Sequence, residues 1–224
     1  MQVVLHKNEI KSMINNTGIL ESHTVYLRTI EREDVTNGQW HHWYNDYNLT
    51  KNNSHGVYPI NTEQELEYYE TTLKDPSNIS LAVSGKNDEK GTAIGTVSLT
   101  NIDLLNRKAE VACTIGKNIS QTAGIEAIGL IIEHGFNRLN LNKIYGGAHQ
   151  DLVEWVSMLE VLGFKKEGLL RQEFVRNGNF YDMIKFSVLS ETYNSLRIER
   201  GESFLFLTSG ELYKNAIKFL KASR

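Results

Sequence analysis

The sequence predicts a mixed α/β domain of the α+β type, because its strand patterns form two antiparallel hairpins on either side of one strand–helix–strand crossover. The first hairpin joins Ile79–Ser84 to Ala93–Leu99 through a polar link that contains two glycines. The second joins Phe164–Val175 to Tyr181–Leu189, and its Asn177-Gly178 pair is typical of a tight hairpin turn. We therefore expect a mostly antiparallel central sheet flanked by helices.

The crossover between the hairpins makes the two strands that it connects parallel to each other. A strand pattern at Ala109–Ile115 precedes a helix over residues 125–139, and Lys143–Ala148 is the next strand. Such connections are right-handed in nearly all sheets. A second helix then opens at the capping-box pattern Asp151-x-x-Glu154 and ends at Gly163.

The N-terminal half predicts a short strand, Val25–Thr29, and two helices. Aromatic residues recur at helical spacing over residues 40–47. The second helix opens at the capping-box pattern Thr62-x-x-Glu65 and ends at Asp75-Pro76, because the residue before proline disfavours the helical conformation. Its expected apolar face consists of Leu66, Tyr69 and Leu73.

The length and composition indicate one domain with an extension at each end. We expect an N-terminal extension over residues 1–23, the core domain over 24–192, and a helical C-terminal extension over 193–224 that includes a helix at 210–223.

Apolar residues make up 40% of the chain, which is typical of a soluble globular protein. The net charge of −3 gives no electrostatic footprint for nucleic acid or an acidic membrane. One cysteine excludes an internal disulfide and no apolar run approaches the roughly 20 residues of a membrane span, so we expect a cytoplasmic protein.

A turn rich in small residues follows the central strand, at Gly116–Ala127. Small side chains let a ligand approach the backbone, and the first amides of a helix have no partner within it. Together with the helix dipole, these amides favour an anion such as a pyrophosphate. An ordinary capped helix start would show the same residues. The turn matches neither a Walker loop nor a dinucleotide-binding fingerprint.

Several segments occur in an order that is typical of one enzyme superfamily. They are Ala109–Ile115 with Ser120–Ala127, His134–Ile144, Leu162–Arg171, Asn177-Gly178 with Tyr181, Leu27-Arg28, and Trp43-x-Asn45-Asp46. This succession, over about residues 24–190, resembles the GNAT N-acetyltransferases, and most of all their ribosomal-protein and polyamine branch. In an ungapped alignment only Gly124, Glu126 and Ala127 fit that branch's glycine-rich turn, whereas a register shifted by two puts Gln121 at its Gln/Arg position.

The resemblance implies a GNAT-type sheet in which two central parallel strands splay apart, with acetyl-CoA as co-substrate between them. The strand at 109–115 would pair with the pantetheine arm, and the turn would hold the pyrophosphate. The implied cofactor-binding residues are Ala112, Cys113, Thr114, Ile115, Ser120, Gln121, Thr122, Ala123, Gly124, Ile125 and Glu126. In this family the amine attacks the thioester directly, so neither a metal nor a cysteine nucleophile is expected.

The resemblance also implies candidates for proton transfer. Glu110 is the first choice for the base, acting directly or through water, because it starts the central strand on the same face as Ala112 and Thr114. A strand-end carboxylate in a salt bridge fits the same position. His149 follows the next strand and would relay a proton near neutral pH, with a surface loop histidine as the alternative.

The sequence departs from the family at the general acid. Many members carry a tyrosine four residues before the Gly-Phe pair, and that residue is Leu159 here. An asparagine that usually opens this region falls at Leu152. Tyr181, Tyr145 or a water would have to serve instead, or the thiolate leaves unassisted. A non-catalytic acyl-CoA-binding module is therefore the alternative from another class of protein.

The acceptor site is implied by the segments that lie over the cleft in this family. They place Trp43, Tyr44, Asn53 and His55 in contact with the substrate, although the aromatic residues also fit a hydrophobic core. One of these segments, the loop Asn48–Pro59, is polar and not strongly acidic. This favours an amino sugar or a nucleotide-linked amino sugar as the small-molecule amine. A polyamine would favour a carboxylate-rich pocket, and a protein N-terminus is equally allowed. The C-terminal helix packs on its own domain or on a second subunit, which would form a homodimer.

Overall fold

The structure is a computed structural model that describes residues 19–38, 40–53, 58–88, 90–116 and 122–201, together with positions 210, 211, 214, 215, 218 and 221. Its strands are β1 (Leu20–Glu21), β2 (Val25–Thr29), β3 (Ile79–Gly85), β4 (Ala93–Asp103), β5 (Lys108–Ile115), β6 (Lys143–His149), β7 (Lys165–Arg176) and β8 (Asn179–Leu189). Its helices are α2 (Arg32–Thr36), α3 (Trp40–Asn45), α4 (Tyr47–Thr50), α5 (Thr62–Lys74), α6 (Ala123–Asn137), α7 (Val153–Val161) and α8 (Ser190–Glu199).

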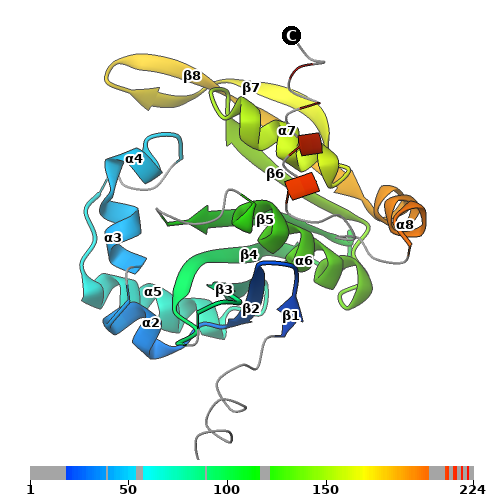
Figure 1. The fold of residues 1–224 in the computed structure, drawn as a ribbon. Helices are drawn as coiled ribbons and strands as arrows, with labels where there is room; N and C mark the ends of the chain where they lie inside the picture. The colour runs from blue at the N-terminus through cyan, green and yellow to red at the C-terminus, as the bar shows by residue number, and fades with distance from the viewer. Residues whose placement is uncertain are drawn as a thin grey trace, which may run out of the picture.

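The strands form one mixed sheet in the order β1-β2-β3-β4-β5-β6-β8-β7 (Figure 1). Every neighbouring pair is antiparallel except β5 and β6, which are parallel and joined through α6. The predicted fold class, with its two hairpins and single crossover, is confirmed.

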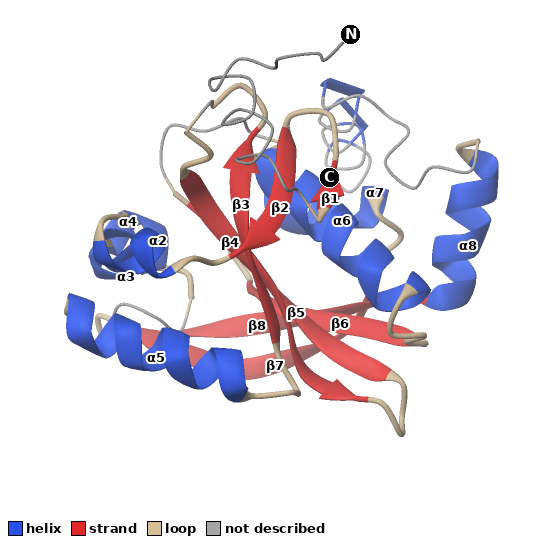
Figure 2. Cartoon of the chain, turned by 90° about the horizontal axis from the view of Figure 1, so that it is seen from below, coloured by secondary structure: helices blue, strands red, loops and turns tan. Residues whose placement is uncertain are grey.

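Helices cover the sheet on both faces. Figure 2 shows α2 to α5 gathered on one side and α6, α7 and α8 on the other. The main core lies on the α6 side, where Ile125, Ile131 and Ile132 are buried against Leu99 and Ile144. A smaller cluster on the opposite face consists of Ile30, Val35, Trp40 and Ala82, with Trp43, Tyr44, Leu66 and Tyr69 packed against it.

Two predicted turns follow the backbone chemistry that their residues favour. Asn177 and Gly178 both have positive φ, at 51° and 78°, as a two-residue hairpin turn with the twist of its strands requires. Gly163 has φ 83° immediately after α7, which is the left-handed conformation that ends helices. The helix α8 follows β8 directly, in the region where the sequence predicts a helical extension over 193–224 but places a helix only at 210–223.

Both predicted capping boxes are wrong. Helix α5 is capped one residue earlier than expected, by Asn61, whose side chain accepts from the Gln64 amide while the Gln64 side chain accepts from the Asn61 amide. Helix α7 starts after Leu152 without a side-chain cap, because a turn from the Leu152 amide to the His149 carbonyl carries the chain out of β6. The face of α5 also differs, since Leu73 is 64% exposed whereas Glu65 is buried.

The ends of the chain are described only in part. Strand β1 lies in the segment that the sequence assigns to an N-terminal extension, and it pairs with β2. Six positions of the predicted tail helix are described, and each is helical. The domain boundaries and the homodimer stay predictions. Among the described residues, no helix combines the length and apolarity that crossing a membrane requires.

Candidate active site

The parallel strands β5 and β6 separate partway along their length. They pair only at three positions, where Lys108–Glu110 lies beside Lys143–Tyr145. Strand β5 continues to Ile115 and β6 to His149, and over these stretches no pairing between them exists in the described structure. The edge of β5 beyond Glu110 is therefore free to pair with a ligand, and Glu110 marks the point of divergence.

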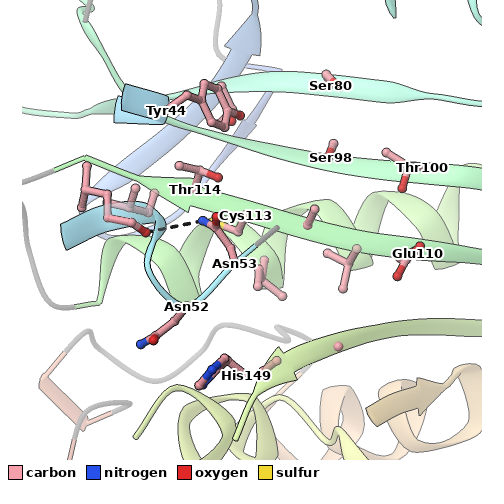
Figure 3. Close-up of a pocket in the computed structure, with 18 of the residues that line it drawn as sticks. Tyr44, Asn52, Asn53, Ser80, Ser98, Thr100, Glu110, Cys113, Thr114 and His149 are labelled. Atoms are coloured by element: carbon pink, nitrogen blue, oxygen red, sulfur yellow. Dashed lines mark hydrogen bonds between the residues drawn. The ribbon is translucent and has the colours of Figure 1, made fainter. Parts of the chain in front are cut away.

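A cavity of about 1210 Å³ opens at this divergence and is lined from both faces of the sheet. Side chains alternate along a strand, so Ala112 and Thr114 share the face of Glu110, whereas Cys113 and Ile115 turn toward α6. All five line the cavity, which therefore passes between the splayed strands. Figure 3 shows His149 across the gap from the strand that carries Glu110 and Thr114.

Glu110 is held beside one cation and one amide. Its Oε2 accepts a hydrogen bond from Asn101 Nδ2 at 3.1 Å, and its Oε1 lies 3.7 Å from Lys185 Nζ. The side chain remains 33% exposed and lines the cavity. This position suits a base at the bottom of the splay, and it also contains the ion pair that the alternative interpretation expects.

His149 is the last residue of β6 and is only 2% exposed, so it is not a surface loop residue. It lines the cavity, and its ring contacts those of Phe174 and Tyr181 in tilted orientations, with centroid distances of 5.1 Å and 4.8 Å. Its Nδ1 accepts a hydrogen bond from the Asp151 amide at 3.2 Å. The imidazole is thereby fixed in one orientation at the cavity wall.

The residues considered for the general acid lie outside the cavity wall. Leu159 is 1% exposed in the main core and has no proton to donate. Tyr181 contacts the ring of His149. Lys185 Nζ lies over the ring of Tyr145, 5.6 Å from the centroid of that ring. Neither tyrosine is among the described residues that line the cavity. Leu152, at the position of the family's asparagine, does line it.

The predicted acceptor residues are only partly brought together. Tyr44 and Asn53 line the cavity, and burial raises the pKa of the Tyr44 phenol. Asn53 Nδ2 donates to the Leu49 carbonyl at 3.4 Å, and the Asn53 carbonyl accepts from Arg176 at the end of β7. Trp43 lies against Gly116 at the end of β5 and not in the cavity wall. His55 lies outside the described residues.

The predicted pyrophosphate turn is described only from Thr122 onward, so Ser120 and Gln121 lie outside the described residues. The segment Thr122–Glu126 is buried and does not line the cavity. Glu126 accepts hydrogen bonds from Thr122 Oγ1, from the amide and hydroxyl of Thr24, and from Ser22. Its carboxylate therefore ties the start of α6 to the turn between β1 and β2. A pyrophosphate contact for these residues stays a prediction.

Two features of the site were missed by the sequence analysis. Glu65 is a buried carboxyl group, 3% exposed, that lines the cavity from α5, and burial raises its pKa to about 7. A row of hydroxyl side chains, Ser80, Ser98 and Thr100, lies on β3 and β4 (Figure 3). Ser98 pairs with Ala112 and Thr100 with Glu110, so strand alternation would have placed this row on the Glu110 face.

Burial raises the pKa of the Cys113 thiol to about 12, so the thiol stays protonated near neutral pH. The described part of the chain contains no group of three His, Cys, Asp or Glu side chains arranged to hold a metal ion.

Comparison with known proteins identifies the class to which this fold and cavity belong. A model of the acetyltransferase (GNAT) domain matches residues 24–165, and the chain belongs to the GNAT acetyltransferase family. It is therefore an acetyl-CoA-dependent N-acetyltransferase, and the resemblance seen in the sequence is confirmed.

Individual relatives agree with this assignment. The chain is 27% identical over 186 residues to spermidine N(1)-acetyltransferase of Escherichia coli (strain K12), a match that covers 82% of this chain and 96% of that protein. It is 34% identical over 106 residues to the uncharacterized N-acetyltransferase p20 of Bacillus licheniformis, covering 47% of this chain and 60% of that protein. The crystal structure of Vibrio cholerae spermidine N-acetyltransferase with CoA and spermine is 25% identical, with a TM-score of 0.67, and the match covers 76% of this chain and 98% of that one.

Proposed function

We propose that this acetyltransferase acetylates a small primary amine that carries at least one further cationic group, as polyamines do. The observation that carries the proposal is the charge of the cavity wall. Three carboxyl groups line it, from Glu65, Glu110 and Glu173, against one lysine, Lys185. Lys185 lies beside Glu110, whereas no described basic residue pairs with Glu65. The spermidine acetyltransferases among the relatives support the same class of acceptor.

The residues of the cavity divide the reaction between them. When bound, acetyl-CoA supplies the thioester carbonyl that the amine attacks. The free edge of β5 beyond Glu110 fits an extended pantetheine arm, since it offers unpaired backbone groups inside an elongated cavity. Glu110, at the divergence, accepts the proton that the ammonium group must lose, directly or through water.

An amino sugar is the second candidate acceptor, because one observation favours it. The hydroxyl row Ser80, Ser98 and Thr100 offers donors and acceptors of the kind that bind sugar hydroxyls. A sugar ring would lie along this row and present its amine toward Glu110. The two candidates differ in charge, so they are separable by experiment.

The test follows free thiol release from acetyl-CoA with a panel of amines that includes spermidine, diaminoalkanes, simple alkylamines, amino sugars and a peptide N-terminus. We expect kcat/KM to be highest for amines with two or more cationic groups. Preference for an amino sugar would select the second candidate. Tight CoA binding without turnover of any amine would instead support a non-catalytic binding module.

Glu110→Gln tests the base. We expect kcat to fall about 10²- to 10⁴-fold, as for loss of a general base, with the Kd for CoA unchanged. Glu173→Gln, which removes a carboxylate from the same cavity away from the divergence, is the matched control. Unchanged kcat in the Glu110 variant would remove this residue from the mechanism.

A further inference from the structure

We infer that His149 donates a hydrogen bond from Nε2 to the sulfur of CoA as the thiolate leaves, and so replaces the phenol that Leu159 cannot supply. The inference rests on the use of acetyl-CoA but not on the identity of the acceptor amine. It adds a thiolate-stabilising residue to a site in which Glu110 serves the other half of the reaction.

The place of His149 in the sheet is the first support. It lies four residues beyond Tyr145, the last residue of β6 that pairs with β5, and therefore on the diverging part of the strand. Glu110 occupies the point of divergence, and both side chains line the same cavity. A thioester held between the splayed strands would have Glu110 at one end and His149 at the other.

The hydrogen bond to Nδ1 sets the tautomer of the ring. Nδ1 accepts from the Asp151 amide at 3.2 Å, so the proton of the neutral imidazole is on Nε2. The Asp151 carboxylate is 3.7 Å from Nδ1, which is beyond hydrogen-bonding distance. The histidine therefore presents a donor on its other nitrogen.

That donor has no hydrogen-bond partner among the described residues. His149 is 2% exposed, and none of the residues that the structure describes accepts a hydrogen bond from Nε2. His149 Nε2 is not among the fully buried side-chain atoms that lack a hydrogen-bond partner, so it keeps some accessible surface at the cavity that the ring lines. A ligand atom with a lone pair, placed in the cavity, would satisfy it.

The packing of the ring makes this donor a fixed one. Phe174 and Tyr181 contact the ring at 5.1 Å and 4.8 Å between centroids, so its direction is set before a ligand enters. Tyr181 thus acts on the imidazole and not on the substrate. A donor fixed in a water-poor site stabilises developing negative charge without having to reorient.

The proton balance limits what His149 does. When the C–S bond breaks, its electron pair goes to sulfur, and the proton of the attacking amine leaves through Glu110 or water. A neutral imidazole is too weak an acid to protonate a thiolate, so Nε2–H keeps its proton and stabilises the thiolate through the hydrogen bond. The thiolate then takes a proton from water, and the hydroxide that this leaves is neutralised by the second proton that the nitrogen loses as the amide forms.

The decisive experiment needs no turnover. The thiol of CoA bound to the protein is titrated by the ultraviolet absorbance of the thiolate, in the wild type and in His149→Phe, which keeps a ring but has no donor. We expect the pKa of the bound thiol to lie at least about one unit lower in the wild type, a tenfold effect on thiolate formation.

His149→Gln, which restores a donor, should give an intermediate value. His134→Phe, a histidine on α6 that does not line the cavity, should match the wild type. Equal thiol pKa values in the wild type and His149→Phe would overturn the inference.

Kinetics provide the second readout. His149→Phe should lower kcat with acetyl-CoA about 10²- to 10³-fold, with little change in the Kd for CoA. With an acetyl thioester of an acidic aromatic thiol, which needs no help to leave, the loss should largely disappear. An equal loss with both thioesters would mean that His149 acts only on the structure of the site. If the wild type acetylates no amine at all, the proposed function fails, while the thiol titration still decides the role of His149.

Discussion

Glu65 is a single carboxyl group whose burial opposes its own ionisation. Its pKa rises from 4.5 to about 7 because α5 places it out of solvent without a basic partner among the described residues. The folded state then binds the proton more tightly than the unfolded state. The contribution of Glu65 to stability is therefore greatest below about pH 4.5, falls as the pH rises toward 7, and stays at its lower value above 7.

Glu65→Gln should remove this decline of stability with rising pH. Above pH 7 we expect the variant to be more stable than the wild type by up to about 3 kcal/mol, which corresponds to the full shift in pKa. Urea unfolding at about pH 5 and about pH 8 measures the effect. Glu67→Gln makes the same change at an exposed position of the same helix, and its stability should keep the wild-type pH dependence. A parallel pH dependence in both variants would contradict the assignment.

Cys113 is half-buried in the cavity wall, and the state of its thiol is testable. With a thiol pKa of about 12, the fraction of thiolate at about pH 8 is very small. We expect iodoacetamide to modify Cys113 in the folded protein at least about a thousandfold more slowly than in the unfolded chain, as followed by mass spectrometry. Activity should survive the same treatment. Rapid labelling of the folded protein would contradict the raised pKa of this thiol.

The site residues show how far sequence reasoning reaches at this scale. Alternation along β5 correctly separates Glu110, Ala112 and Thr114 from Cys113 and Ile115, because a strand has only two faces. Glu65 was missed because it was assigned to a capping box, whereas Asn61 and Gln64 form that box and leave Glu65 free to turn inward. Moving the start of a helix by one residue changes the expected direction of a side chain by about 100° around the helix axis. That rotation decides whether the side chain faces the solvent or the cavity.

At the scale of elements, two glycines with the same backbone conformation have different surroundings. Gly163 and Gly178 have φ of 83° and 78°, so an alanine is strained at both. A Cβ at Gly178 would meet nothing within 4 Å, whereas one at Gly163 would lie 2.8 Å from Leu196 Cδ1 and 2.9 Å from Thr192 Cγ2. The first turn joins two strands, and the second packs the end of α7 against α8.

We expect Gly178→Ala to lower the free energy of unfolding by about 1 to 2 kcal/mol, from backbone strain alone. Gly163→Ala should lose the same amount and about 1 to 3 kcal/mol more, because the Leu196 and Thr192 side chains of α8 must shift away from the added methyl group. Denaturant unfolding of both variants measures the difference. Equal losses would show that α8 yields without resistance.

Elements were predictable where a local signal fixes them. The Asn-Gly turn and the capping glycine impose positive φ on two short stretches, and the elements on either side follow. Helix α8 was missed because its sequence, Ser190–Glu199, is largely polar and buries only Tyr193. Its position depends on contacts with β8, which directly precedes it, and with the end of α7, which lies far from it in sequence.

At the scale of the whole molecule, the splay of β5 from β6 joins two half-sites that the rest of the sheet separates. The half-site on the α6 side is walled by Ile128 and by Trp155 of α7, and the half-site on the α5 side by Ser98 and Glu65. The sequence reveals the crossover that makes β5 and β6 parallel. The depth of the splay depends on the packing of both helical layers and could be expected only from the family resemblance.

This division predicts that the two substrates can be impaired one at a time. Trp155 lies over the start of α6, where its ring is 3.1 Å from the place of a Cβ on Gly124. Trp155→Ala should weaken CoA binding about tenfold, as for the loss of one aromatic contact, and leave the KM of the amine nearly unchanged. Ser98→Leu, which fills the opposite half-site, should raise the amine KM at least about tenfold while the Kd for CoA stays at its wild-type value. Calorimetry with CoA and steady-state kinetics with the best amine measure the four quantities. If each variant impaired both substrates equally, the cavity would act as one undivided site, and the sheet would not separate acceptor from donor.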